Sequence, residues 1–143
     1  YNASLGAWYI RTADGTLLQW GKIWGGPGLY PVPGDYDGDG VWDLAMYAEA
    51  TGKWYIQTMA GQLLAYAVSW GGPGFQPVPG DYDGDGLWDL AVYNASLGAW
   101  YARTLQGRYI FFNTPWGTPA AEAVTWTWSM PPAAGGGPEE EAR

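Results

Sequence analysis

The stretch PVPGDYDGDGVWDLAMY at residues 31–47 dominates this 143-residue sequence, and it returns as PVPGDYDGDGLWDLAVY at residues 77–93. Each copy carries four aspartates and three glycines within ten residues. The chain has nine aspartates, and eight of them lie in these two stretches, the ninth being Asp14. A solvated turn needs far less charge, so the pattern indicates that the carboxylates have a role beyond keeping a turn in solvent.

The two stretches belong to an internal repeat of 46 residues. Residues 1–46 align with residues 47–92 without a gap, and 28 of the 46 paired positions are identical. The third unit keeps the early aromatic positions but lacks the Asp-rich stretch. We therefore divide the chain into repeat 1 (1–46), repeat 2 (47–92), a partial, divergent repeat 3 with a C-terminal strand (93–128) and a flexible Pro/Gly/Glu tail (129–143).

Short β-strands separated by turn signals fill each unit. In the first unit we expect strands at 7–12, 17–24 and 42–47, with a shorter strand near 30–32. About 46 residues with three or four strands are typical of one blade of a β-propeller. The predicted fold class is therefore all-β, built from tandem blade-like repeats of short antiparallel strands.

A propeller ring normally takes about four to eight blades. Two complete units and a partial third cannot close such a ring within one chain. A fragment of a longer propeller, an oligomer that closes a ring and an open stack remain as alternatives. The strand-like segment AVTWTWSM at residues 123–130 could fill the strand position missing before residue 1, in the same chain or in the next subunit.

The spacing of the aspartates resembles that of a calcium-binding loop. They occupy positions 1, 3, 5 and 9 of a loop with glycine at position 6 and a backbone carbonyl expected at position 7, as in the first nine positions of an EF-hand loop. Four clustered carboxylates repel one another unless a cation lies among them, and hard oxygen ligands favour Ca²⁺ over Mg²⁺. The predicted ligands are Asp35, Asp37, Asp39, Val41 and Asp43 in the first stretch, and Asp81, Asp83, Asp85, Leu87 and Asp89 in the second.

The motifs DYDGDGVWDLAMY and DYDGDGLWDLAVY, each preceded by PVPG, resemble the FG-GAP/VCBS-type repeats. These are the calcium-binding blades of integrin α-subunit propellers and of many bacterial surface and secreted proteins. The resemblance covers residues 1 to about 119. It implies a propeller-like fold and one Ca²⁺ ion in each Asp-rich loop, two sites in all.

The chain contains eleven tryptophans, eight of which share three repeat positions and are predicted to pack between blades. The other three fall outside the repeat and are candidates for a ligand or subunit interface: Trp20, Trp126 and Trp128. Two glycosylation sequons begin at Asn2 and Asn94.

The composition disfavours several classes of function. A net charge of −8 disfavours nucleic acid as a partner, and no apolar run is long enough for membrane insertion. The chain has no Cys and no His, which removes the usual nucleophile and general-base arrangements, and we do not expect an enzyme. Tyr1 is neither an initiator Met nor part of a signal peptide, which indicates a mature product or a fragment.

These observations together predict a calcium-stabilised extracellular or cell-surface module with a structural or adhesive role, part of a larger surface protein or assembly. The expected partners are other copies of the chain, further repeats of a longer chain, glycans or surface proteins. One alternative is a propeller-type lectin that binds glycans between blades. Another is a self-assembling extracellular fibre subunit that joins its neighbour by strand addition.

Overall fold

The computed structural model describes residues 1–118, 121 and 123. This part of the chain forms ten β-strands and no helix. The strands are β1 (Ala7–Arg11), β2 (Leu17–Ile23), β3 (Tyr30–Pro31), β4 (Leu44–Ala48), β5 (Lys53–Gln57), β6 (Leu63–Ser69), β7 (Phe75–Pro77), β8 (Leu90–Asn94), β9 (Ala99–Arg103) and β10 (Tyr109–Pro115).

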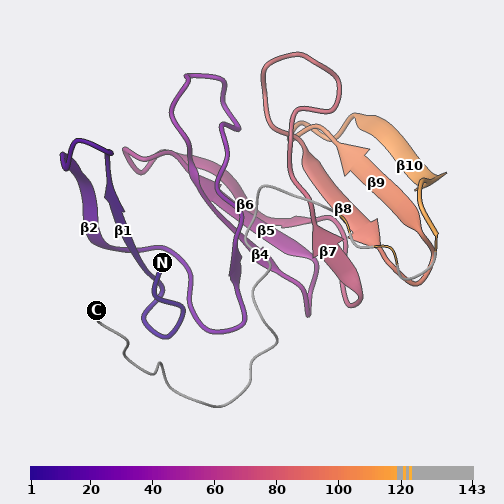
Figure 1. Cartoon of the computed structure of the whole chain (residues 1–143), viewed down its shortest axis with the longest axis horizontal. Coiled ribbons are helices and arrows are strands. Elements are labelled where there is room, and N and C mark those ends of the chain that lie inside the picture. Colours follow the sequence, from indigo (N-terminus) through magenta and orange to yellow (C-terminus); the bar gives the residue numbers. More distant parts are fainter. Residues whose placement is uncertain (119–120, 122, 124–143) are drawn as a thin grey trace.

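The strands form three antiparallel sheets in which neighbours in sequence are neighbours in space. β1 and β2 form a two-stranded sheet, and two four-stranded sheets follow in the orders β3-β4-β5-β6 and β7-β8-β9-β10. The sheets lie one after another like successive blades, and none closes into a barrel (Figure 1). The prediction of an all-β repeat of short antiparallel strands is confirmed, and all four strands expected in the first unit are present.

Each four-stranded sheet straddles a boundary between two 46-residue units. The sheet β3–β6 takes β3 and the first half of β4 from repeat 1, since β4 crosses the boundary at residues 46–47, and it ends at Ser69, within repeat 2. The sheet β1–β2 corresponds to the second half of such a blade. Before β1, the described chain contributes one isolated bridge, in which Asn2 pairs with Ala7.

The largest core cluster lies between the two four-stranded sheets. Trp54 and Ile56 of β5 are fully buried there against Leu90 and Val92 of β8. A second cluster joins the first sheet to the second, where Trp8 packs with Met46. Alternation along each strand sends one set of side chains to the preceding sheet and the other to the following sheet, which is how short blades share their cores.

Six of the eight repeat-position tryptophans are buried or packed against these cores, but Trp42 and Trp116 are not. Their exposed fractions are 53% and 76%, so neither has the buried core role that its repeat position predicts. Trp42 still contacts the ring of Trp88 from the second loop, at a centroid distance of 5.4 Å. The indole of Trp54 also donates a hydrogen bond to the carbonyl of Trp70 (2.8 Å), and the same bond joins the corresponding tryptophans of the other two sheets.

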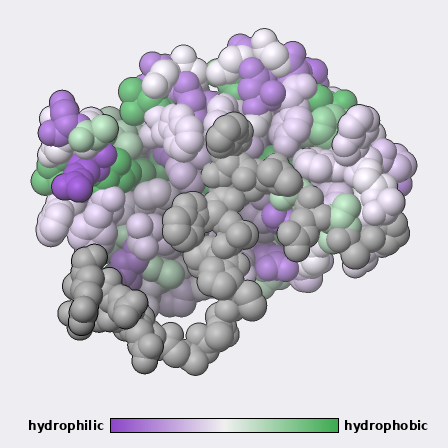
Figure 2. Space-filling view, in the orientation of Figure 1, coloured by the Kyte–Doolittle hydropathy of each residue, from purple (hydrophilic) through white to green (hydrophobic). Residues whose placement is uncertain are grey.

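The surface is mixed, with apolar side chains gathered near the end formed by β1 and β2 (Figure 2). Leu17 and Ile23 are 57% and 63% exposed there. Within the described residues, no helix is long and apolar enough to cross a membrane.

Candidate metal centre

Each Asp-rich stretch forms a loop between the first two strands of a four-stranded sheet. The first loop (residues 34–43) joins β3 to β4, and the second loop (residues 80–89) joins β7 to β8. A backbone bridge closes the base of each loop: the N–H of Asp43 donates to the carbonyl of Gly34 (2.7 Å), and that of Asp89 donates to Gly80 (2.8 Å). Both loops are therefore held at both ends by the sheet.

Backbone N–H groups orient the carboxylates inside each loop. Asp35 accepts hydrogen bonds from the N–H groups of Gly38 (2.7 Å) and Gly40 (2.9 Å). These two glycines have φ values of 79° and 82°, a left-handed conformation that side chains disfavour. Asp81 accepts the corresponding bonds from Gly84 and Gly86 at the same distances. The glycines turn the chain so that its N–H groups and carboxylates point into one small volume, as their spacing predicts.

The last aspartate of each loop is buried. Asp43 is 1% exposed and accepts a hydrogen bond from the N–H of Tyr36 (2.8 Å), and Asp89 is 1% exposed and accepts one from Tyr82 (2.8 Å). Burial raises the pKa of both carboxyls to about 6, and repulsion from the other aspartates of the same loop adds to the effect. Each loop thus buries a carboxyl group whose ionised form is disfavoured, and a cation bound in the loop would stabilise that ionised form.

The structure brings most of the predicted aspartates close together. Carboxylate oxygens of Asp35, Asp37 and Asp39 lie within 4.8 Å of one another in the first loop, and so do those of Asp81, Asp83 and Asp89 in the second. Val41 and Leu87 lie at the expected position, where their N–H groups donate to Asp39 (2.7 Å) and Asp85 (2.9 Å). Their roles as carbonyl ligands remain predictions.

The donor set fits a hard divalent cation. Every side chain gathered in the loops is a carboxylate, and oxygen ligands in this number suit Ca²⁺ better than a transition metal. Within the described residues, the first loop has no Lys or Arg in an ion pair with any of its carboxylates. The aspartates are therefore available to a metal ion, which would supply the positive charge that the loop lacks.

The two loops touch each other through Trp88. The backbone N–H of Trp88 donates to the backbone carbonyl of Asp35 (2.8 Å). The indole of Trp88 lies over Gly34, and its ring centroid is 5.4 Å from that of Trp42. A β-carbon added to Gly34 would lie 2.1 Å from the indole. The first loop is therefore packed directly under the second, a contact that the sequence signals only through the shared repeat position of the two tryptophans.

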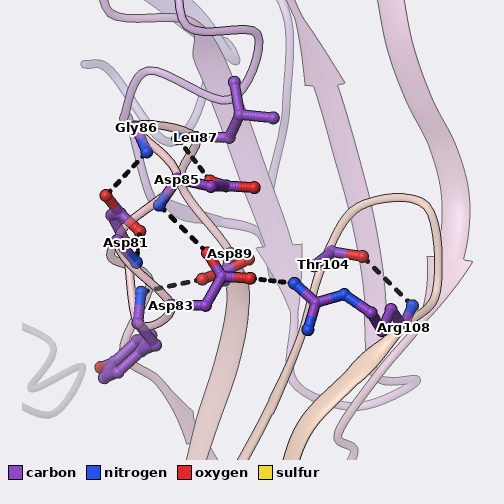
Figure 3. A network of polar contacts seen from close by, with 10 residues as sticks. Asp81, Asp83, Asp85, Gly86, Leu87, Asp89, Thr104 and Arg108 are labelled. Atoms are coloured by element: carbon purple, nitrogen blue, oxygen red, sulfur yellow. Dashed lines mark hydrogen bonds and ion pairs between the residues drawn. The ribbon is translucent and has the colours of Figure 1, made fainter.

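Sequence reasoning missed Arg108. This residue follows the turn between β9 and β10, and its guanidinium forms an ion pair with the carboxylate of Asp83 (Figure 3). The two residues are 25 positions apart and belong to no common motif. Only a comparison of the repeats draws attention to the position, because residue 62, one repeat earlier, is Gln.

The tryptophans predicted to form a ligand or subunit interface lie outside both acidic loops in the sequence. Trp20 is 76% exposed and meets Tyr9 edge-on at 5.2 Å, and the corresponding positions of the next two sheets hold Tyr66 and Phe112. Trp20 therefore occupies an aromatic repeat position, which corrects its assignment to a place outside the repeat. Trp126 and Trp128 lie outside the described residues.

The two sequon asparagines form the same local turn. The side-chain carbonyl of Asn2 accepts a hydrogen bond from Leu5 (3.1 Å), and that of Asn94 accepts one from Leu97 (3.1 Å). These bonds explain an asparagine at both places without a glycan. Glycosylation remains a prediction.

The fold and the loops define a class of protein, a tandem array of β-blades with acidic inter-strand loops. Residues 35–92, which run from the first loop through the second, match the family model of the FG-GAP-like repeat. This match confirms the predicted resemblance for the segment that contains both loops. No curated protein and no solved structure matches the chain. Repeats of this kind generally form propeller-like structural or adhesive modules rather than enzymes.

Proposed function

We propose that the chain is a calcium-stabilised extracellular module with a structural or adhesive role. The observation that carries the proposal is the duplication of the acidic loop with the same internal hydrogen bonds, each loop holding a buried aspartate whose charge is destabilised by its surroundings. A turn that served only to solubilise the chain would not need a buried carboxylate at its base. The match to the FG-GAP-like repeat supports the same assignment.

The chain's own residues explain how an ion would act on stability. Asp43 and Asp89 immediately precede β4 and β8, so a cation held by the loop would also fix the start of each of these strands. Calcium would supply the charge that offsets the repulsion among the aspartates. At affinities of about 10⁻⁴ to 10⁻³ M, which are typical of extracellular modules, 1 mM calcium adds on the order of 0.4 to 1.4 kcal/mol per site.

Calcium stoichiometry tests this assignment. We expect isothermal titration calorimetry to give two ions for the natural sequence and one ion each for Asp37→Ala and Asp83→Ala. A chelator should lower the melting temperature of the natural sequence. Asp14→Ala, which removes an aspartate outside the loops, should still give two ions. Unchanged stoichiometry in both loop variants would refute the calcium assignment.

A glycan-binding function is a second candidate, favoured by one cavity. The cavity has a volume of about 190 Å³ and lies between the first and second sheets, lined by Trp24, Gly25, Leu29, Met46, Tyr55 and Tyr66. Typical ligand pockets measure about 300 to 1,000 Å³, so this one would accommodate at most a small part of a glycan. Aromatic faces stack on the apolar faces of sugars, and Tyr66 is 68% exposed.

A glycan array distinguishes the two candidates. A signal that is lost in Tyr66→Ala, Trp20→Ala, Trp126→Ala or Trp128→Ala would favour the lectin. No signal on the array, together with two calcium ions in the titration, would favour the structural module.

A further inference from the structure

The two acidic loops differ in one charged neighbour. Arg108 supplies its guanidinium to Asp83 of the second loop, and the pair forms the only salt bridge among the described residues. The corresponding neighbour of the first loop is Gln62, because the repeat places residue 62 where residue 108 lies one unit later. Gln62 is neutral, so the first loop lacks a resident cation at this position.

The turn that carries Arg108 is well defined. The N–H of Arg108 donates to the hydroxyl of Thr104 (3.1 Å), and the N–H of Thr104 donates back to the carbonyl of Arg108 (2.9 Å). Gln62 and Thr58 make the same pair of bonds (3.0 and 2.8 Å). The backbone therefore presents the two side chains equivalently, and what differs between the loops is the side chain itself.

The second loop and the β9–β10 turn lie at the same end of their sheet, which allows the contact (Figure 3). The side chain of Asp83 is 14% exposed, whereas that of Arg108 is 63% exposed. The guanidinium thus reaches a carboxylate of the candidate metal centre from the solvent side, and it can swing away without disturbing a core.

We propose that Arg108 is a tethered cation that competes with calcium for the second loop, so that the second loop binds calcium more weakly than the first. The proposal rests on the calcium sites proposed above. Without calcium, Arg108 acts as a counter-ion for the crowded aspartates of the second loop. With calcium, it must give up Asp83 and remain near a divalent ion that repels it. The second site thus has a side chain that lowers its affinity, whereas the equivalent residue at the first site, Gln62, is neutral.

The expected size of the effect follows from Coulomb's law. A unit charge about 6 Å from a divalent ion, in surroundings close to bulk water, changes the affinity about 10-fold. Screening at about 0.15 M salt reduces this change to about 3-fold. The difference between the loops should therefore be largest at low ionic strength.

Each site can be measured alone by calorimetric titration with CaCl₂. In an Asp37→Ala background only the second loop should bind, and Arg108→Gln should then raise its calcium affinity about 10-fold at low salt and about 3-fold at 0.15 M. Arg108→Lys, which keeps the charge, should leave the affinity within about 2-fold of the unmodified background. In an Asp83→Ala background, Gln62→Arg should lower the affinity of the first loop by a similar factor.

Stability in a chelator provides an independent readout. Arg108→Gln should lower the melting temperature in EDTA, because the apo loop loses its counter-ion, and it should enlarge the increase that calcium produces. Damage to the fold alone would lower the melting temperature in both conditions and would not raise an affinity.

The outcomes separate this inference from the calcium assignment. If neither background binds calcium, the calcium sites themselves are refuted. If both backgrounds bind calcium but Arg108→Gln leaves the second site unchanged or weakens it, calcium binding stands and the role of Arg108 is overturned.

Discussion

Replacing Asp43 with asparagine should stabilise the fold in a chelator at neutral pH, and calcium should remove most of that advantage. Asp43 is 1% exposed, and its carboxylate accepts a hydrogen bond from the N–H of Tyr36 (2.8 Å). The amide oxygen of asparagine can accept the same bond at nearly the same volume. The substitution therefore removes the buried negative charge while the shape of the loop is kept.

The magnitude follows from the pKa of Asp43, which burial raises from 3.8 to about 6. Well below pH 3.8 the carboxyl is protonated in both the folded and the unfolded chain, so its burial as a charge does not lower the free energy of unfolding. As the pH rises from 3.8 through 6, the unfolded chain releases this proton before the folded chain does. The free energy of unfolding therefore falls by about 3 kcal/mol by pH 7.5. The new amide N–H₂ group needs a partner in a buried place, which costs about 1 to 2 kcal/mol. The net gain for Asp43→Asn in chelator is therefore about 1 to 2 kcal/mol.

Urea unfolding at pH 4.0 and pH 7.5, in EDTA and in 5 mM calcium, measures these differences. We expect Asp43→Asn to be more stable than the natural sequence in EDTA at pH 7.5. In calcium at that pH most of this advantage should disappear, because the natural loop gains about 1 to 2 kcal/mol from the ion and the variant loop has lost a ligand. Asp14→Asn is the control: hydrogen bonds from Thr12 and Thr16 lower the pKa of this exposed carboxyl, so its removal should bring no gain at pH 7.5. If Asp43→Asn proves less stable than the natural sequence in EDTA at pH 7.5, the buried charge is not a source of instability and the reasoning fails.

Two further predictions concern packing and assembly. Gly34→Ala would place a β-carbon 2.1 Å from the indole of Trp88 and should cost about 1 to 3 kcal/mol in urea unfolding, whereas the equivalent Gly80→Ala, whose nearest new contact is Tyr82 at 3.5 Å, should change stability by less than about 0.5 kcal/mol. Equal effects of the two substitutions would contradict the proposed contact between the loops. For the fibre alternative, electron microscopy and size-exclusion chromatography should show long assemblies that disappear when residues 121–143 are removed. Identical sizes with and without this segment would exclude assembly through the C-terminal segment.

Much of the local structure could be predicted because it depends on residues close in sequence. Glycines at fixed positions in each loop adopt the left-handed conformation that its turns require, and the bonds to Asp35 and Asp81 span only three to five residues. The strands follow from runs of aromatic and aliphatic residues between turn signals. For the same reason, three of the four carboxylates predicted in each loop lie close together, Asp43 and Asp85 being outside these groups.

Contacts between repeats were harder to predict, because equivalent residues need not have equivalent neighbours. Trp42 and Trp88 occupy the same repeat position, yet Trp88 packs on the first loop while Trp42 is 53% exposed. Trp20 appeared to stand outside the repeat because the aromatic residue changes type from one unit to the next.

The sequence by itself determined the 46-residue period, the all-β class and the two acidic loops, since short-range spacing controls turns and strands. Only the tertiary structure decided that the two loops are in contact and that Arg108 reaches Asp83. The physical reason is that antiparallel strands bring a loop and a distant hairpin turn to the same end of a sheet. Charges that meet there interact through space, and their separation along the chain gives no sign of it.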